Sequence, residues 1–558
     1  MKAVFVFPPI WTKKSPSTGI TSISGYLKTF GIETKIFDFN IDYYSEKLTD
    51  ENYNLVFDFV QELLLKQNPN ENESDIIRIY KENEEIYNSL KGQINKSVEL
   101  VRSTEYYNSD KYKMASLIIA KAIEFISLPY FPFIIFDEKI ENLKNEFKYE
   151  DYKSEALNIN NIFYSYMSKR ALEIIDEKPD CVGISINFEG QMLAGLTLAH
   201  ILKKKHNIKV MLGGTNITRS IENIRIDNSF FEKFADYVMI GDGEIPTLKL
   251  LRYFQGICSI EEVPSIIYKE NGIIKFNELL KEKISIDFSQ DFDYTTEKQY
   301  FLPEKVFPIN ISKGCYWGKC KFCDFGLQYS HKNLEKVIQE IKTLKEKYNA
   351  KYFYLTDSAL SPKTAKAFAD LLIDEKLDIR WTTFLRFEEV YDKKFLLHLY
   401  KSGLRCVSWG LESASQKVLD LMNKGTKVSV IQRILKDSAD LGIANRLTVI
   451  YLFPGETYRD FCETIDFLKQ NKKNIFFIIF HRYLLKRYSY VFEHMDEFGI
   501  NLTTQDIKSE YQANELGISY KQEDYDIKLN ELSSISSGTY KNPDETLLYF
   551  SYKEKEFS

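Results

Sequence analysis

The sequence has few cysteines, no excess of basic charge and no long apolar run, and each absence excludes a class of protein. Seven cysteines in 558 residues do not make a disulfide framework. The formal net charge of −6 provides no basic field that would attract nucleic acid or anionic lipid. The apolar segment that starts at Phe125 is too short and too interrupted by proline to span a bilayer.

The N-terminal segment also lacks the pattern of a secretory signal. Its apolar residues form a short strand-like run that Pro8 and Pro9 interrupt. Three of the cysteines lie within nine positions of one another. The other four are scattered along the chain, at Cys181, Cys258, Cys406 and Cys462. These features predict a cytoplasmic protein with no membrane or nucleic-acid partner.

Residues 1–260 predict a Rossmann-like, doubly wound α/β domain with a helical insertion. Short buried strands alternate with helices at the start and again from Cys181, which is typical of a parallel sheet covered on both faces. Between about residues 45 and 170 the periodicity is helical, and this stretch is too long for a plain loop. Residues 261–300 predict a linker with a β-hairpin around Asn271–Gly272.

Residues 301–498 predict a second α/β domain, a partial (β/α)6 barrel of the TIM type. Six apolar strand patterns alternate with helical patterns from Val306 onward. In such a barrel the chemistry lies at the C-terminal ends of the strands. Residues 499–558 are polar, and we expect them to form a C-terminal cap or tail.

The most informative segment is SKGCYWGKCKFCDFG, Ser312–Gly326, which follows the first strand of the second domain. Its three cysteines, Cys315, Cys320 and Cys323, are close enough to bind one soft metal centre, and no fourth cysteine is near. A structural zinc site made only of cysteine would require a fourth ligand. His331 is available as that ligand, so a zinc site is the alternative interpretation.

Three cysteine ligands leave one iron of a [4Fe-4S] cluster open, and the segment resembles the cluster motif of the radical SAM superfamily. In that family the open iron binds the amino and carboxylate groups of S-adenosylmethionine (SAM). The usual spacing is C-x3-C-x2-C, whereas four residues, Tyr316–Lys319, separate the first pair here. Phe322 occupies the aromatic position that lies against the adenine in the family.

Positions after the later strands also resemble SAM-binding positions of the family. They are Asp357, Arg386, Glu412, Ser413, Pro454 and Gly455. The resemblance implies that Asp357 lies near the methionine amino group and that Arg386 pairs with a carboxylate. Glu412 and Ser413 belong to a WGLES motif near the ribose or amino acid, and the FPGET turn helps to hold the nucleoside. Each position also suits a structural role, such as a loop cap, a surface ion pair or a turn before a helix.

The order of elements in the first domain resembles the cobalamin-binding domain that precedes many radical SAM barrels. Glycines at strand ends allow a flat cofactor or a phosphate to approach the backbone, although any doubly wound sheet uses such turns. The resemblance implies a cobalamin site at Gly213, Gly214, Thr215, Asn216, Gly241, Gly243 and Glu244. The D-x-H-x-x-G motif is missing, so another group, or none, would ligate the lower face of cobalt.

The resemblance implies a cobalamin-dependent methyltransferase that acts on an unactivated carbon or phosphorus centre in natural-product or peptide modification. SAM cleavage would yield a 5′-deoxyadenosyl radical, and methylcobalamin would supply the methyl group. It also implies a small-molecule or peptide substrate and an external electron donor such as flavodoxin or ferredoxin. The alternatives are a radical SAM enzyme of another reaction type (rearrangement, ring or bond formation) and a non-catalytic metal or redox sensor.

The cysteine count narrows these choices further. A methylthiotransferase of this layout would carry three further cysteines in its N-terminal domain, where this chain has only Cys181 and Cys258. Members with auxiliary clusters need cysteines beyond the barrel, and none follows Cys462. We therefore expect a single cluster in each chain.

Overall fold

The computed structural model describes residues 1–145, 148–280, 287–324, 329–504, 510–518, 521 and 525–529. The chain divides into two units, and the main division lies between Lys305 and Val306. No helix among the described residues is long and apolar enough to cross a bilayer.

The first unit is built on a seven-stranded sheet with the order β2-β1-β5-β6-β7-β8-β9. The strands are β1 (Lys2–Phe7), β2 (Glu33–Asp38), β5 (Cys181–Ser185), β6 (Val210–Gly213), β7 (Tyr237–Met239), β8 (Ile266–Glu270) and β9 (Ile273–Phe276). The first five in spatial order are parallel. The sheet confirms the predicted doubly wound fold. However, β8 and β9, the hairpin that we expected in a linker, are the antiparallel edge of this sheet.

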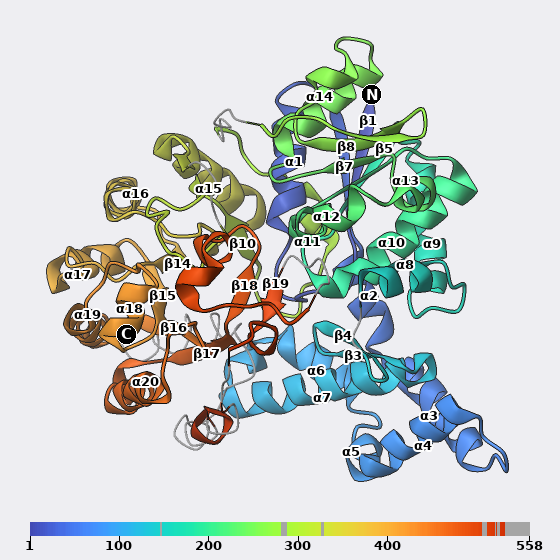
Figure 1. Cartoon of the computed structure of the whole chain (residues 1–558), viewed down its shortest axis with the longest axis horizontal. Helices are drawn as coiled ribbons and strands as arrows, with labels where there is room; N and C mark the ends of the chain where they lie inside the picture. The colour runs from blue at the N-terminus through green and yellow to red at the C-terminus, as the bar shows by residue number, and fades with distance from the viewer. Residues whose placement is uncertain are drawn as a thin grey trace. The chain divides into compact units, whose positions relative to one another are not determined.

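Helices cover both faces of this sheet, which explains why its strands have few polar residues. Helices α1 (Thr18–Lys28) and α14 (Glu244–Phe254) lie on one face, and α9 (Tyr164–Asp176) and α10 (Met192–His200) lie on the other (Figure 1). Phe5 of β1 shares a buried cluster with Leu27 of α1 and Leu251 of α14. Shorter helices α11 (Thr215–Arg219), α12 (Ile221–Ile224) and α13 (Asn228–Lys233) connect β6 to β7.

A largely helical insertion separates β2 from β5. It contains α2 (Phe39–Lys47), α3 (Asp50–Leu64), α4 (Glu71–Glu82), α5 (Glu84–Ser89), α6 (Ile94–Val101), α7 (Ser109–Ser127), the hairpin β3 (Phe133–Phe136) and β4 (Lys139–Asn142), and α8 (Tyr149–Ala156). The ring of Phe125 contacts Tyr53 and Tyr87 at centroid distances of 4.6 and 4.8 Å. Because these rings are fully buried, the insertion has an aromatic core of its own.

The second unit is a partial barrel of six parallel strands in the order β10-β13-β14-β15-β16-β17. The strands are β10 (Val306–Ile309), β13 (Tyr352–Leu355), β14 (Arg380–Leu385), β15 (Leu404–Glu412), β16 (Ala444–Tyr451) and β17 (Phe477–Arg482). The helices on its outside are α15 (Leu334–Tyr348), α16 (Pro362–Asp374), α17 (Lys393–Lys401), α19 (Val428–Asp440) and α20 (Tyr458–Gln470) (Figure 1). This arrangement confirms the predicted (β/α)6 barrel.

A post-barrel segment follows β17. It contains β18 (Leu484–Lys486), which pairs with β19 (Glu510–Gln512), and the short helix α21 (Tyr490–Glu493). Buried Tyr483 and Leu485 pack there with Phe453 from the turn after β16. Much of the tail that we expected at 499–558 (residues 505–509, 519–520, 522–524 and 530–558) lies outside the described residues.

Candidate functional site

The three clustered cysteines lie on one loop at the C-terminal end of the first barrel strand. This cysteine loop, Gly314–Asp324, follows β11 (Ser312–Lys313), which pairs with β12 (Ser330–His331). Cys315, Cys320 and Cys323 are half-buried, and none of the three is in a disulfide. Of the motif SKGCYWGKCKFCDFG, the last two residues lie outside the described part of the chain. The loop therefore presents three thiols where a TIM-type barrel has its chemistry.

Asp357, directly after β13, holds the entry to the cysteine loop. Its carboxylate accepts hydrogen bonds from the Ile311 amide (3.2 Å) and from both the amide and the hydroxyl of Ser312. Asp357 is 1% exposed, and this burial raises its pKa. The resemblance to the family implied a contact with the methionine amino group. In this structure the carboxylate contacts the segment that enters the cysteine loop, which is a positioning role.

A second support for the cysteine loop is the segment Met422–Gly425, here called the cradle segment, which follows α18 (Gln416–Leu421). The amide of Lys321 donates to the Met422 carbonyl (3.0 Å), and the Asn423 side chain donates to the Lys319 carbonyl (3.0 Å). The indole of Trp317 donates to the Asn423 carbonyl (3.3 Å). No local sequence pattern marks this segment as part of the site, because it lies about 100 residues beyond the cysteines.

Arg386, after β14, joins the cysteine loop to the cradle segment. Its Nη1 donates to the sulfur of Cys320 (3.6 Å), and its Nη2 donates to the Lys424 carbonyl (2.5 Å). Its guanidinium lies 4.1 Å from the centroid of the Trp317 ring, and its Nε is 3.6 Å from the Glu388 carboxylate. The residue expected to pair with a SAM or substrate carboxylate thus contacts a cysteine and two supporting segments.

Glu412 ends β15 in a left-handed conformation, with φ of +60°. Its carboxylate pairs with Lys424 (2.7 Å) and is 3.4 Å from the Thr448 hydroxyl. Both side chains of the ion pair are 8% exposed, so the pair is buried at the strand ends. Ser413 is fully buried, and its hydroxyl contacts that of Thr464 (3.0 Å). Ser413 therefore contacts helix α20, on the outside of the barrel.

The FPGET turn after β16 is held by its own glutamate. The Leu452 amide donates to the Glu456 carboxylate (2.6 Å), and the Glu456 amide donates to the Phe453 carbonyl (2.8 Å). Gly455 is exposed with φ of +88°, while Pro454 is buried. Phe322 of the cysteine loop packs against the apolar cluster that contains Phe453. The fold thus brings the predicted adenine contact and the predicted nucleoside turn to one cluster.

Glu456 is also the group at this turn whose protonation is most perturbed. Burial raises the pKa of its carboxyl to about 8, from a usual value of 4.5. The native carboxyl therefore keeps its proton between these two values, where the carboxyl in the unfolded chain has lost it. Because the native state then binds more protons, stability falls as the pH rises through this window, by up to about 1.4 kcal/mol per pH unit.

Replacing Glu456 with glutamine is expected to remove this loss, since the amide does not titrate. The free energy of unfolding of Glu456→Gln relative to the wild type should shift in favour of the variant as the pH rises from about 5 to about 8. Urea denaturation of both proteins at several pH values in this window measures the difference. A difference that stays constant with pH would contradict the assignment.

The edge of the first unit's sheet brings together part of the predicted cobalamin set. Gly214 has φ of +104°, and a Cβ there would lie 2.5 Å from the Ile186 carbonyl oxygen, so glycine is required. The Asn216 amide donates to the same carbonyl (3.1 Å). The Thr215 amide donates to the Asn187 side chain (3.3 Å). Gly213 ends β6, so these residues form one turn at the C-terminal edge.

The other predicted cobalamin residues follow β7. Gly241 has φ of +70°, an added Cβ there would meet nothing within 4 Å, and its amide donates to the Thr218 hydroxyl (3.0 Å). A Cβ at Gly243 would meet the Ile23 side chain at 2.7 Å. The carboxylate of Glu244 is buried and accepts from the Ser22 hydroxyl of α1 (2.6 Å). Glu244 therefore ties two helices together on one face of the sheet.

The residues at the switch point of this sheet, between β1 and β5, were not predicted from the sequence. The Trp11 and Phe188 rings stack there at a centroid distance of 3.2 Å. Gln191 donates to the Pro8 carbonyl (2.7 Å) and accepts from the Asn187 amide (3.0 Å). Ligands of doubly wound sheets bind at such switch points. Only the strand order reveals the pairing, because the loops are about 180 residues apart.

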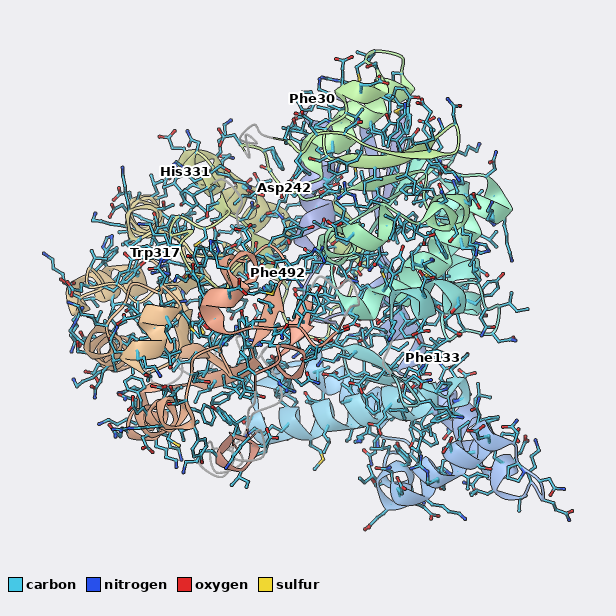
Figure 2. All side chains as sticks on the ribbon, in the orientation of Figure 1. Phe30, Phe133, Asp242, Trp317, His331 and Phe492 are labelled. Atoms are coloured by element: carbon cyan, nitrogen blue, oxygen red, sulfur yellow. The ribbon has the colours of Figure 1, made fainter. Side chains whose placement is uncertain are left out.

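No group of three or more His, Cys, Asp or Glu side chains among the described residues is arranged to hold a single metal ion. Such an arrangement would be needed for the alternative zinc site with His331. His331 pairs with Ser312, just before the cysteine loop (His331 and Trp317 of that loop are labelled in Figure 2). The His331 ring contacts the neighbouring Lys332 carbonyl. A four-iron cluster does not require such a group, since each cysteine binds a different iron.

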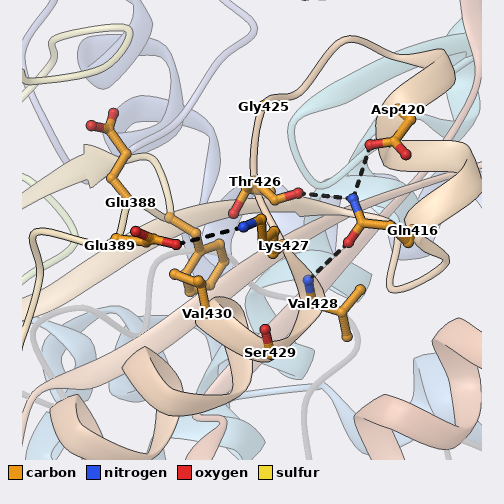
Figure 3. Close-up of a pocket in the computed structure, with 11 residues that line it drawn as sticks. Glu388, Glu389, Gln416, Asp420, Gly425, Thr426, Lys427, Val428, Ser429 and Val430 are labelled. Atoms are coloured by element: carbon orange, nitrogen blue, oxygen red, sulfur yellow. Dashed lines mark hydrogen bonds and ion pairs between the residues drawn. The ribbon is translucent and has the colours of Figure 1, made fainter.

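A cavity of about 630 Å³ lies beside the cradle segment (Figure 3). Its lining includes Phe387–Glu389, Gln416, Asp420 and Gly425–Val430. The Gln416 side chain bridges the Asp420 carboxylate, the Thr426 carbonyl and the Val428 amide. These three bonds connect α18 to the start of α19, and the cradle segment lies between these two helices in the chain.

Comparison with known proteins agrees with this geometry. Residues 309–468 match the model of the radical SAM superfamily. An uncharacterized methyltransferase of Pyrococcus horikoshii is 27% identical over 52% of this chain and 64% of its own length. Bacteriochlorophyllide d C-8(2)-methyltransferase of Chlorobaculum tepidum is 30% identical over 32% of this chain and 41% of its own length. The chain thus spans less than two thirds of each of these curated relatives.

Two solved structures share the fold. The radical SAM methyltransferase TsrM from Kitasatospora setae, solved with cobalamin and a [4Fe-4S] cluster, covers 91% of this chain and 81% of its own, with a TM-score of 0.54 and 13% identity. The cobalamin-dependent SAM radical enzyme OxsB covers 70% and 64%, with a TM-score of 0.54 and 18% identity. Residues 309–468 of this chain therefore form a radical SAM domain.

Proposed function

We propose that this chain is a radical SAM enzyme that binds a [4Fe-4S] cluster through Cys315, Cys320 and Cys323, and that it is a cobalamin-dependent methyltransferase. The observation that carries the proposal is the placement of three cysteines, none of them in a disulfide, on one loop at the C-terminal end of β10. The supports of that loop come from the ends of later strands in the same barrel. The match to the radical SAM model over residues 309–468 supports the same assignment.

The residues present fit the cluster. Gly314 and Gly318 have φ of +73° and +61°, so the loop curves in a way that side chains would oppose. Arg386 supplies a positive charge beside Cys320, which suits a thiolate ligand. When bound, a cluster with three protein ligands supplies an open iron for SAM and the electron that cleaves it.

The roles that we propose for the chain's own residues follow from their contacts. Asp357 and the cradle segment hold the cysteine loop, while the buried Glu412–Lys424 pair provides charged groups for the polar end of SAM. The apolar cluster around Phe453 excludes water from one side of the adenine position at Phe322. Holding reactants in register and keeping water out is the contribution that a protein makes to such chemistry.

Cobalamin binding is the second part of the proposal. It is supported by the shared fold with TsrM and OxsB, whose solved structures contain cobalamin, and by the turn at Gly213–Asn216, where Gly214 has a positive φ. We expect the corrinoid to bind along this edge of the sheet. We further propose a small-molecule or peptide substrate, and an electron donor such as flavodoxin or ferredoxin.

Anaerobic reconstitution tests the proposal. The protein should take up about four iron and four sulfide per chain and, with dithionite, should form 5′-deoxyadenosine from SAM. It should also retain added hydroxocobalamin through gel filtration, and turnover should yield S-adenosylhomocysteine. Iron and sulfide near eight each would contradict the single cluster. A protein that cleaves no SAM would contradict the enzyme assignment.

A second candidate reaction, the formation of a ring, is favoured by two relatives that share one description. Anaerobic magnesium-protoporphyrin IX monomethyl ester cyclase of Rubrivivax gelatinosus is 30% identical over 30% of this chain and 32% of its own length. A radical SAM enzyme that forms a ring or another bond would make 5′-deoxyadenosine without S-adenosylhomocysteine. The ratio of these two products separates the two reactions.

Gly214→Ala is expected to weaken corrinoid retention by about tenfold or more, because the new Cβ would overlap the Ile186 carbonyl and displace the turn. Hydroxocobalamin titration followed by absorbance measures the affinity. Gly31→Ala is the matched control, since Gly31 also has positive φ (+72°) but nothing lies within 4 Å of its added Cβ. Equal affinity in Gly214→Ala and wild type would argue against a corrinoid at this edge.

A further inference from the structure

The longer interval between the first two cysteines is anchored by two aromatic side chains. The hydroxyl of Tyr316 donates to the carboxylate of Glu388, after β14. The indole of Trp317 donates to the Asn423 carbonyl of the cradle segment. An interval that served only as a spacer would not need such contacts. Two of the four residues between the cysteines instead reach supports on different parts of the barrel.

The cradle segment is shaped to receive the Trp317 indole. Gly425 has φ of +69°, and a Cβ there would lie 2.6 Å from Cη2 of the indole, closer than real atoms approach. Any side chain at position 425 would therefore displace the ring. The close approach indicates that the glycine and the tryptophan form one packing unit.

Arg386 connects this packing unit to the sulfur of Cys320. Its guanidinium lies over the indole at 4.1 Å from the centroid, and its Nη1 is 3.6 Å from the Cys320 sulfur. Arg386 is 5% exposed and is also held by the Lys424 carbonyl, so it has little freedom to move. The indole, the guanidinium and the sulfur thus form a continuous chain of contacts.

We propose that Trp317 is a positioning residue, which packs on Gly425 and under Arg386 so that Arg386 holds Cys320 as a cluster ligand. The longer C-x4-C interval is then a functional part of the site, since it carries the anchor. The inference rests on the cluster proposed above. It adds that a charged hydrogen bond to the Cys320 sulfur raises the reduction potential of that cluster, as donors to ligand sulfurs do.

A double-mutant cycle tests the packing unit. In anaerobically reconstituted protein, Trp317→Ala and Gly425→Ala should each speed iron release to a chelator by about tenfold. The double variant should release iron no faster than Trp317→Ala, because the clash is gone once the indole is removed. Lys363→Ala, an exposed change on the outer helix α16, is the control and should match the wild type. Effects of the two single changes that simply add would overturn the proposal.

A redox titration followed by electron paramagnetic resonance tests the effect on the potential. Arg386→Gln should lower the ratio of reduced to oxidised cluster at a fixed potential by about tenfold, which is about 59 mV for one electron. Arg386→Lys should recover part of this shift, and Trp317→Ala should move the potential in the same direction as Arg386→Gln. A wild-type protein that takes up no cluster would contradict the function proposed above. A loaded wild type whose potential is unchanged in all three variants would overturn only the positioning role.

Discussion

Replacing any one of Cys315, Cys320 and Cys323 with alanine is expected to abolish cluster binding and SAM cleavage. With one ligand lost, the cluster has only two protein sulfurs, and the half-buried loop opens a second iron to solvent. Iron should fall from about four per chain to well below one, and formation of 5′-deoxyadenosine should fall by about a thousandfold or more. Iron analysis and product chromatography under anaerobic conditions measure both effects.

Cys462→Ala is the matched control for this prediction. Like the loop cysteines, Cys462 is half-buried and in no disulfide, but it lies on helix α20 outside the barrel strands. It should leave iron content and SAM cleavage unchanged. If a cysteine-loop variant kept a full complement of iron, the assigned ligand set would be wrong. If Cys462→Ala lost iron as well, the loss would reflect a general effect of cysteine removal.

Lys424→Met is expected to destabilise the protein by about 3–5 kcal/mol, because it leaves the buried Glu412 carboxylate without its partner. Both side chains are only 8% exposed, so water cannot replace the lost ammonium at little cost. Urea denaturation of the cluster-free protein, followed by circular dichroism, measures the change in the free energy of unfolding.

Two further variants make this prediction specific. Lys424→Met combined with Glu412→Gln should recover much of the loss, because no charge is then buried alone. Lys417→Met removes a lysine that pairs with Asp460 but is 54% exposed, and it should cost at most about 1 kcal/mol. Equal costs for Lys424→Met and Lys417→Met would show that the Glu412–Lys424 pair is not buried in solution.

The alternation of strands and helices was predictable because it depends on local periodicity. Buried strands such as Cys181–Ser185, between amphipathic helices, imply a parallel sheet whichever strands are neighbours. The hairpin at Ile266–Phe276 was also predicted as a hairpin, but its membership of the first sheet was not. Its place depends on pairing with β7, which local pattern does not specify.

The site likewise has features that the sequence predicts and contacts that it does not predict. The cysteine loop was identifiable because its three cysteines lie within nine positions. The contacts of Asp357 with Ser312, of Ser413 with Thr464 and of Glu244 with Ser22 were not predictable from position alone. A polar residue at a strand end can face a ligand or a neighbouring segment, and packing decides which.

By itself, the sequence determined the two α/β domains, the three-cysteine loop after the first barrel strand and the radical SAM resemblance that these residues carry. Periodicity and short spacings indicate such features, because the residues that form each feature are close along the chain. Only the tertiary structure decided how the C-x4-C interval is used, by placing Gly425 and Arg386 against Trp317. That contact joins segments about 70 and 110 residues from the loop, so no local pattern contains it.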